Sequence, residues 1–224
     1  MRCSVVIPTL NEARTIARTL RRVERLHPHE IIVSDGGSTD GTPELAASCA
    51  TVISGRRGRG RQLSAGAAAA SGDVLLFLHA DVTLPGQALS AINAALEDPQ
   101  IIGGCFRVRF GSEPHQAFIA ASYDLLRLGG RAIVYGDSTI FARRDVFKEV
   151  GGFADWPIME DVNFVSRLRR RGRFVELPLT VVPSSRRWRQ GGLWRTWASW
   201  WAIQLMFGAG VSPAWLGRFY RHIR

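Results

Sequence analysis

Cysteine and lysine are scarce in this chain. Its three cysteines, Cys3, Cys49 and Cys105, are odd in number and lack metal-ligand spacing. This argues against a disulfide framework or a zinc site and predicts core thiols in a reducing compartment. Lys148 is the single lysine among 29 basic residues. Arginine suits bidentate contacts with phosphate, although a coding bias would produce the same excess.

A long apolar run near the N-terminus is also missing. The apolar segment before Pro8 is too short for the core of a signal peptide, so we expect a cytoplasmic protein. The 224 residues are 46% hydrophobic and 21% charged, which excludes a disordered polymer and a multidomain assembly. One substantial domain with at most a short appendage is expected.

The net charge of +10 belongs to the C-terminal part of the chain. Residues 167–224 carry twelve arginines and one acid, whereas residues 1–166 sum to −1. A basic protein that binds nucleic acid without catalysis is therefore one alternative. An uncharged, tryptophan-rich stretch interrupts the positive charge, and no nucleic-acid-binding module is visible, so we expect no nucleic-acid partner.

Short apolar runs alternate with amphipathic segments over the first hundred residues. This order predicts parallel strands joined by right-handed crossovers, with ligand loops at the carboxyl ends of the strands. The expected fold is an α/β sheet flanked by helices, and Asn11 is placed to cap the first helix. Strands are predicted at 5–8, 31–33, 52–53 and 74–78, and helices at 13–26, 42–50, 61–70 and 86–97.

The pattern changes after Pro99. Loose alternation predicts an edge or one-sided strand, and no linker precedes about residue 190. We expect a domain over 1–190 and a helical segment over 191–224. Further elements are predicted as strands at 101–110 and 140–141 and helices at 116–128, 143–150 and 161–171.

Residues 196–217 contain no charged residue. Four tryptophans lie in it and Trp194 just precedes it, glycine, serine and proline interrupt the stretch, and arginines flank it on both sides. Tryptophan prefers the membrane interface to the hydrocarbon centre. These features predict that residues 192–224 form a helical hairpin on an anionic membrane surface. Core packing or a dimer contact, and a true membrane span, remain alternatives.

A glycine-rich segment, Ser34–Thr42, directly follows the second predicted strand. Its glycines, including Gly36 and Gly37, allow the backbone to approach a ligand closely. Asp35 can accept hydrogen bonds from a base or a ribose. The segment therefore suits a nucleotide pocket, while a turn that caps the following helix is the alternative.

Acidic residues occur at two more places. His79 and Asp81 follow the most hydrophobic predicted strand and suit Mn²⁺ or Mg²⁺ held jointly with a diphosphate; a structural salt link is the alternative. Glu160 and Asp161 open a predicted helix, where the macrodipole favours acids. An ionised carboxylate in a cleft can deprotonate an attacking hydroxyl.

Four motifs stand in a fixed order along residues 3–190: Val5–Glu12, Ser34–Thr42, His79–Asp81, and Gly151–Phe153 followed by Glu160–Asp161. Together they resemble the family 2 glycosyltransferases. The resemblance implies a GT-A fold and inverting transfer of a sugar from a nucleotide-diphosphate donor, of UDP or GDP type, to a hydroxyl acceptor.

The resemblance also implies roles for individual residues. Asp35 would bind the base, Asp81 would hold a divalent metal, Mn²⁺ or Mg²⁺, and Asp161 would be the general base. The implied nucleotide-sugar pocket comprises Pro8, Thr9, Asn11, Glu12, Asp35, Gly36, Gly37 and Ala80, the metal site Asp81 and His79, and the catalytic acids Asp161 and Glu160.

Two positions depart from the family pattern. His79 stands where an acid is usual in the family. A bacterial subgroup of short family 2-like transferases shares this His-Ala-Asp variant. Processive members carry Gln-x-x-Arg-Trp, whereas Ser184 replaces the glutamine here, which favours single additions. Arg187 is retained and would contact the diphosphate. Trp188 would stack on a sugar, with an interface anchor as its alternative.

The Gly-Arg run Gly55–Gln62 precedes a predicted helix. We assign it, with Arg61, to the donor phosphates, and a solvated loop is the alternative. The alternative enzyme is a nucleotidyltransferase on a related fold. That enzyme would need a glycine-rich loop with a basic residue directly after the first strand, and Thr9–Glu12 occupies this place instead. The tryptophan-rich tail suggests a lipid-linked acceptor and a location at the inner face of the cell membrane.

Overall fold

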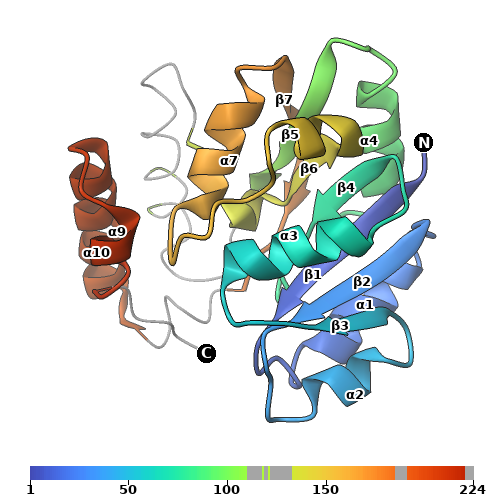
Figure 1. Cartoon of the computed structure of the whole chain (residues 1–224), viewed down its shortest axis with the longest axis horizontal. Helices are drawn as coiled ribbons and strands as arrows, with labels where there is room; N and C mark the ends of the chain where they lie inside the picture. Colours follow the sequence, from blue (N-terminus) through green and yellow to red (C-terminus); the bar gives the residue numbers. More distant parts are fainter. Residues whose placement is uncertain (110–117, 119–120, 122–132, 185–190, 220–224) are drawn as a thin grey trace.

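The computed structural model describes most of the chain (Figure 1). The predicted helix 116–128 lies, apart from two residues, outside the described residues, as do Arg187 and Trp188. The described residues are 1–109, 118, 121, 133–184 and 191–219.

A seven-stranded sheet forms the centre of the described structure, in the order β3-β2-β1-β4-β6-β5-β7. The first four strands are parallel, β6 runs antiparallel to both of its neighbours, and β7 is parallel to β5. The mostly parallel sheet confirms the predicted α/β class. The strands are β1 (Cys3–Thr9), β2 (Glu30–Asp35), β3 (Thr51–Ser54), β4 (Val74–Phe77), β5 (Ile101–Val108), β6 (Ile140–Arg143) and β7 (Arg173–Val181).

Helices cover both faces of the sheet (Figure 1). Along β1, Val5 and Ile7 pack on one face with α1 (Ile16–Glu24), α2 (Thr42–Ala46) and α4 (Ala88–Ala95). Val6 packs on the other face with α3 (Arg59–Ala69), α6 (Arg144–Glu149) and α7 (Glu160–Leu168). Because strand side chains alternate between faces, apolar residues at consecutive positions predict burial on both sides. The helices are α1 (Ile16–Glu24), α2 (Thr42–Ala46), α3 (Arg59–Ala69), α4 (Ala88–Ala95), η1 (Gly136–Ser138), α6 (Arg144–Glu149), α7 (Glu160–Leu168), α9 (Leu193–Gly208) and α10 (Pro213–Leu216).

Two expectations about these elements were wrong, and one strand was not predicted. β5 is an interior strand between β6 and β7, because its first six residues are buried and the polar alternation begins only beyond them. β7 was not predicted, since Glu176 and Pro178 interrupt its pattern; its place at the edge of the sheet tolerates proline. Asn11 does not cap α1, whose N-cap is Thr15.

The C-terminal helices pack against the domain through one face. Ile203 of α9 and Leu216 of α10 bury their side chains against Ile158 and Met159, which precede α7. The predicted helical character of this segment is confirmed, and packing against the domain accounts for part of its apolar surface. Within the described residues, no helix is both long enough and apolar enough to cross a membrane.

The cysteines match their predicted role in part. Cys3 and Cys105 are buried, and Cys49 is half-buried. Burial raises the pKa of the Cys3 thiol to about 12, so this group stays protonated and unreactive at neutral pH.

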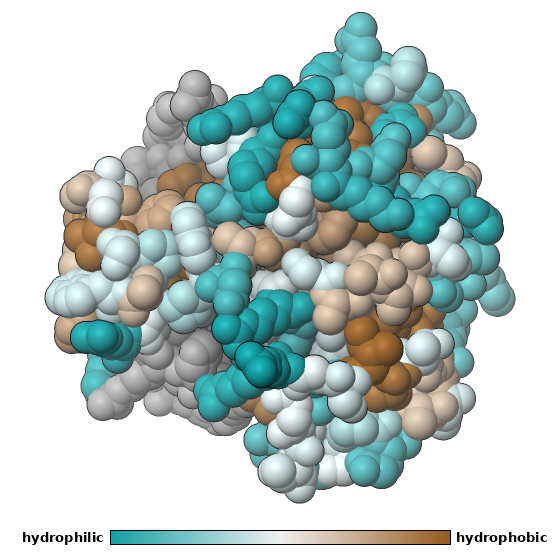
Figure 2. All heavy atoms as spheres, viewed as in Figure 1, coloured by the Kyte–Doolittle hydropathy of each residue, from teal (hydrophilic) through white to brown (hydrophobic). Residues whose placement is uncertain are grey.

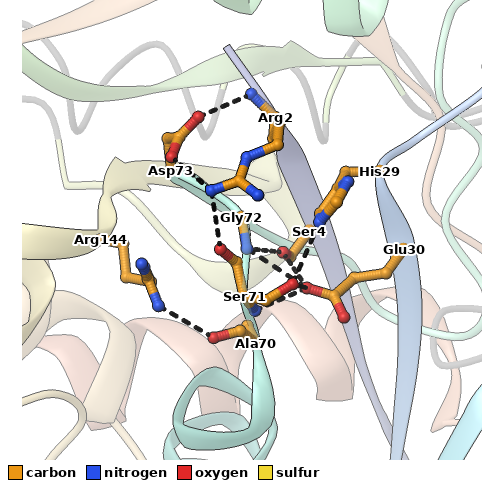
Figure 3. Close-up of polar contacts among 9 residues, drawn as sticks. All are labelled: Arg2, Ser4, His29, Glu30, Ala70, Ser71, Gly72, Asp73 and Arg144. Atoms are coloured by element: carbon orange, nitrogen blue, oxygen red, sulfur yellow. Dashed lines mark hydrogen bonds and ion pairs between the residues drawn. The ribbon is translucent and has the colours of Figure 1, made fainter.

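A polar cluster joins the amino ends of β1, β2 and β4 (Figure 3). Oε1 of Glu30 accepts hydrogen bonds from Oγ of Ser4 at 2.6 Å and from N and Oγ of Ser71 at 2.6 and 2.9 Å. Partial burial raises the pKa of Glu30, but the bonds from Ser4, Ser71 and Gly72 outweigh it and hold that pKa below its ordinary value. The ionised carboxylate therefore stabilises the edge of the sheet opposite the ligand loops.

Replacing this carboxylate tests the cluster. We expect Glu30→Gln to cost about 1 kcal/mol of unfolding free energy, a shift of about 2–4 °C in a chain of this size. Because the folded pKa is lowered, the carboxylate's contribution is complete above the unfolded value of 4.5 and is lost as the pH falls through the folded pKa. Thermal unfolding against pH measures this difference.

Glu24→Gln is the matched control, since Glu24 is exposed. The interpretation fails if Glu30→Gln and Glu24→Gln shift the melting temperature equally at neutral pH.

Candidate active site

The carboxylate of Asp35 organises the glycine-rich loop at the end of β2. Its Oδ2 accepts from the backbone N of Gly37 at 2.9 Å and of Ser38 at 2.7 Å. Its Oδ1 accepts from Oγ1 of Thr9 at 3.0 Å and Oγ of Ser38 at 2.5 Å. With four donors on a carboxylate that is 2% exposed, Asp35 holds the loop in shape. Its predicted bond to a base would require Ser38 or Thr9 to turn away.

Hydrogen bonds connect this loop to the residues after β1. The backbone N of Asn11 donates to Oγ of Ser38 at 2.8 Å, and Oδ1 of Asn11 accepts from N of Thr39 at 2.9 Å. The backbone N of Glu12 donates to Oγ1 of Thr42 at 2.8 Å. Asn11 also adopts a positive φ of 56°. The structure thus brings the predicted pocket residues of β1 and β2 together at one edge of the sheet.

Gln62 belongs to the same group and was missed from the sequence. Its buried side chain donates from Nε2 to the carbonyl of Thr9 at 2.6 Å and of Ser34 at 2.9 Å. A Cβ on Gly36 would lie 2.9 Å from the Gln62 side chain, so glycine is required there for this close approach. The position of Gln62 at the end of the Gly-Arg run and near the start of a helix was the available signal, but sequence alone does not show that Gln62 is buried.

A second group surrounds Gly136, which precedes β6. The backbone N of Gly136 donates to Oδ2 of Asp161 at 2.6 Å. A Cβ on Gly136 would lie 2.6 Å from Nε2 of His79 and 3.4 Å from Oδ2 of Asp161. Nδ1 of His79 lies 3.3 Å from Oδ1 of Asp137. His79, from the loop after β4, and Asp161, from α7, are therefore neighbours.

The loop after β4 carries the other predicted metal ligand. Asp81 is half-buried in the turn, two residues beyond His79. Ala80 is buried, and its carbonyl accepts from Oγ1 of Thr19 at 2.6 Å, which ties the turn to α1. No cluster of three or more histidine, cysteine or acidic side chains suited to a metal ion occurs among the described residues. A cation here would need ligands from a bound molecule.

Glu160 and Asp161 open α7, as predicted, but their side chains differ in environment. Glu160 is 0% exposed, and Nε of Arg59 donates to its Oε1. Burial raises the pKa of Asp161, and the charge of Glu160 raises it further. Arg59 and the backbone N–H groups of Gly136 and Val162 lower it. Asp161 is thus a stronger base than an exposed aspartate.

Of the remaining predicted residues, only Arg61 is described, and it stands apart from these two groups. Arg61 is exposed and pairs with Asp155 at 2.6 Å, so the structure places it on the surface beside the loop before α7. Arg187 and Trp188 lie outside the described residues. The Gly136–Asp137 pair and Arg59 are contacts that the sequence analysis did not find; a Gly-Asp pair before a short strand was the available signal.

Most of the chain, up to the segment before α7, matches a known family model. The model described as Glycosyl transferase family 2 covers residues 4–151. The chain belongs to glycosyltransferase family 2. The match confirms the predicted family. It does not test the His-Ala-Asp variant at residues 79–81 of this glycosyltransferase.

The alignment with individual relatives covers only part of the relatives' length. The O-antigen chain rhamnosyltransferase RfbN of Salmonella typhimurium is 25% identical over 196 residues, which are 77% of this chain and 62% of that protein. The chain thus spans less than two thirds of the length of this curated relative.

Solved structures share the fold. A mannosyltransferase from Pyrobaculum calidifontis, in complex with GDP-Man and Mn²⁺, has a TM-score of 0.71 at 22% identity and covers 94% of this chain and 64% of its own. Glucosyl-3-phosphoglycerate synthase from Mycobacterium tuberculosis, with Mn²⁺, UDP and glucosyl-3-phosphoglycerate, has a TM-score of 0.64 at 21% identity and covers 94% and 81%. The GT-A fold prediction is confirmed.

The close packing around Gly136 is testable without a substrate. Gly136→Ala places a methyl group against the His79 ring, so we expect that ring or Asp161 to move. The His79 ring resonance should then shift in NMR spectra. Gly86→Ala is the control, because no atom lies within 4 Å of its added Cβ. An unchanged His79 resonance in Gly136→Ala would show that the two side chains are not packed around this glycine.

Proposed function

We propose that this enzyme transfers one sugar at a time from a nucleotide-diphosphate donor to a hydroxyl acceptor, with inversion at the anomeric carbon. The observation that carries the proposal is the meeting of His79 and Asp161 around Gly136. This meeting places the loop of the proposed metal ligands beside the proposed base. The neighbours described above, bound to GDP-Man and to UDP, support the nucleotide-sugar class.

In the proposed mechanism Asp161 takes the proton of the acceptor hydroxyl. The acceptor oxygen then bonds to the anomeric carbon as the bond from that carbon to the diphosphate oxygen breaks on the opposite face. The backbone N–H groups of Gly136 and Val162 orient the carboxylate, each bonding one oxygen at 2.6 and 2.8 Å. Each oxygen keeps a second lone pair that can accept the proton.

His79 and Asp81 suit a divalent cation whose remaining ligands come from the donor. An imidazole nitrogen and a carboxylate oxygen match Mn²⁺ or Mg²⁺. Asp137 beside Nδ1 favours the His79 tautomer whose Nε2 is available to a cation. When bound, the cation supplies charge neutralisation for the departing diphosphate.

Donor turnover tests this proposal. The enzyme is incubated with a panel of UDP- and GDP-sugars, with and without Mn²⁺ or Mg²⁺, and nucleoside diphosphate release is followed. We expect metal-dependent release that Asp81→Ala abolishes. Asp161→Asn should lower turnover with acceptor by about 10²–10⁴-fold, while donor affinity, measured by calorimetry, is retained.

Asp145→Asn is the matched control. Asp145 also lies in the first turn of a helix, and its Oδ1 also accepts from the next backbone N, at 2.8 Å, but it is exposed and remote from this group. If Asp161→Asn transfers sugar as fast as Asp145→Asn, the assignment of the base is wrong.

We also propose that the acceptor is lipid-linked and that α9 and α10 lie on an anionic membrane surface, at the inner face of the cell membrane. Large apolar side chains project from these helices and from the turn that follows: Trp194 is 67% exposed, Leu205 68%, Trp215 43% and Phe219 61%. In Figure 2 the surface over α9 and α10 is mostly pale and brown. Aromatic side chains beside Arg195 and Arg218 suit an interface of this kind.

An aromatic contact connects this helical pair to the site. The ring of Trp200, on α9, lies 5.6 Å from the ring of Tyr135, which immediately precedes Gly136. Burial raises the pKa of Tyr135, and the nearby charge of Asp161 raises it further. An acceptor held at the membrane by its lipid would therefore enter next to the proposed base.

Vesicle flotation tests the membrane surface. We expect the protein to float with vesicles that contain phosphatidylglycerol and to lose at least half of this binding in Trp194→Ser/Trp215→Ser. Leu45→Ser is the control, because Leu45 is 44% exposed on α2. If Trp194→Ser/Trp215→Ser binds the vesicles as well as Leu45→Ser does, the proposed membrane surface is wrong.

A further inference from the structure

The buried carboxylate of Glu160 depends on one ion pair. Its Oε1 accepts from Nε of Arg59, whereas its Oε2 has no hydrogen-bond partner, and the side chain is 0% exposed. Removing one partner of a buried pair leaves an uncompensated charge, which costs more than removing both. Arg59 is therefore the ion-pair partner that compensates the Glu160 carboxylate in this position.

The surrounding backbone is packed closely around the pair. A Cβ on Gly60 would lie 2.3 Å from the carbonyl oxygen of Ala154 and 3.4 Å from Cβ of Glu160. The start of α3 is thus pressed against the start of α7. Two residues further along α3, Gln62 holds the ends of β1 and β2. The first turn of α3 consequently contacts both groups of site residues.

We propose that Arg59 is a positioning residue for the proposed base: its ion pair with Glu160 fixes the first turn of α7 and hence the orientation of Asp161. This inference rests on the proposed function, in which Asp161 is the base. It gives Glu160 a supporting role, since a fully buried carboxylate does not reach a substrate. It also separates Arg59 from the donor contacts expected of the Gly-Arg run.

The charges around Asp161 support this arrangement. Glu160 is adjacent in sequence, Arg59 faces it from α3, and Tyr135 and His79 approach from the segment before η1 and from the loop after β4. Arg59 opposes the effect of Glu160 on the pKa of Asp161. Without Arg59, two adjacent acids would lie in a buried site without the cation that now pairs with Glu160.

The alternative is that Arg59 binds the donor diphosphate directly, since its side chain is 33% exposed. A double-mutant cycle of Arg59→Met and Glu160→Gln separates the two roles. If Arg59 acts through Glu160, Arg59→Met lowers kcat by about 10–100-fold with donor KM changed less than about 3-fold. In the Glu160→Gln background the same change then costs less than about 3-fold.

Two further readouts keep the test independent of folding and of turnover. The Gly136 amide donates to Asp161, so its NMR resonance reports the position of the base. We expect this resonance to move in Arg59→Met and to return toward the wild-type position in the double variant. Arg59→Lys, which retains a cation, should keep most of kcat. Thermal unfolding verifies that each variant is folded.

Arg171→Met is the control, because Arg171 pairs with Glu149 at 2.7 Å on the surface, where both side chains are at least half exposed. The inference is overturned if Arg59→Met raises donor KM equally in both backgrounds, or leaves kcat and the Gly136 resonance unchanged. Wild-type enzyme without donor turnover would instead contradict the proposed function, and the Gly136 resonance would still decide whether Arg59 positions Asp161.

Discussion

A charged carboxylate buried at the start of α7 is the constraint on which the site depends. Arg59 reaches the buried Glu160 carboxylate from α3, and a buried charge without a partner would cost several kcal/mol. The pair joins two helices that cover the same face of the sheet. Asp161, the next residue, is held in turn by the backbone of Gly136.

The topology of the sheet explains why distant motifs meet. Parallel strands β1, β2 and β4 end at the same edge, so their following loops lie side by side. The antiparallel strand β6 begins at that edge, and Gly136, at the start of the short helix η1 before β6, is thereby brought to the loop of His79. A side chain at position 136 would lie against both His79 and Asp161, so at least one of them would have to move.

Much of this architecture could be predicted from the sequence. The motifs around Asp35, His79 and Asp161 were found because strand ends and helix starts have local patterns. Gln62 and Arg59 lie in the Gly-Arg run that was assigned to the donor phosphates, but their packing roles were not predicted, because these roles depend on long-range burial, which neither periodicity nor composition reports. β7 was missed since an edge strand is stabilised by its neighbour β5 rather than by its own pattern.

The most direct measurement is a crystal structure with Mn²⁺ and a nucleoside diphosphate, in which anomalous scattering locates the metal. The account predicts one manganese ion held by Asp81 and His79, in contact with the diphosphate, with Asp161 facing the same cavity. A diphosphate bound away from the loop after β4, or an Asp161 side chain separated from it by protein, would contradict the account.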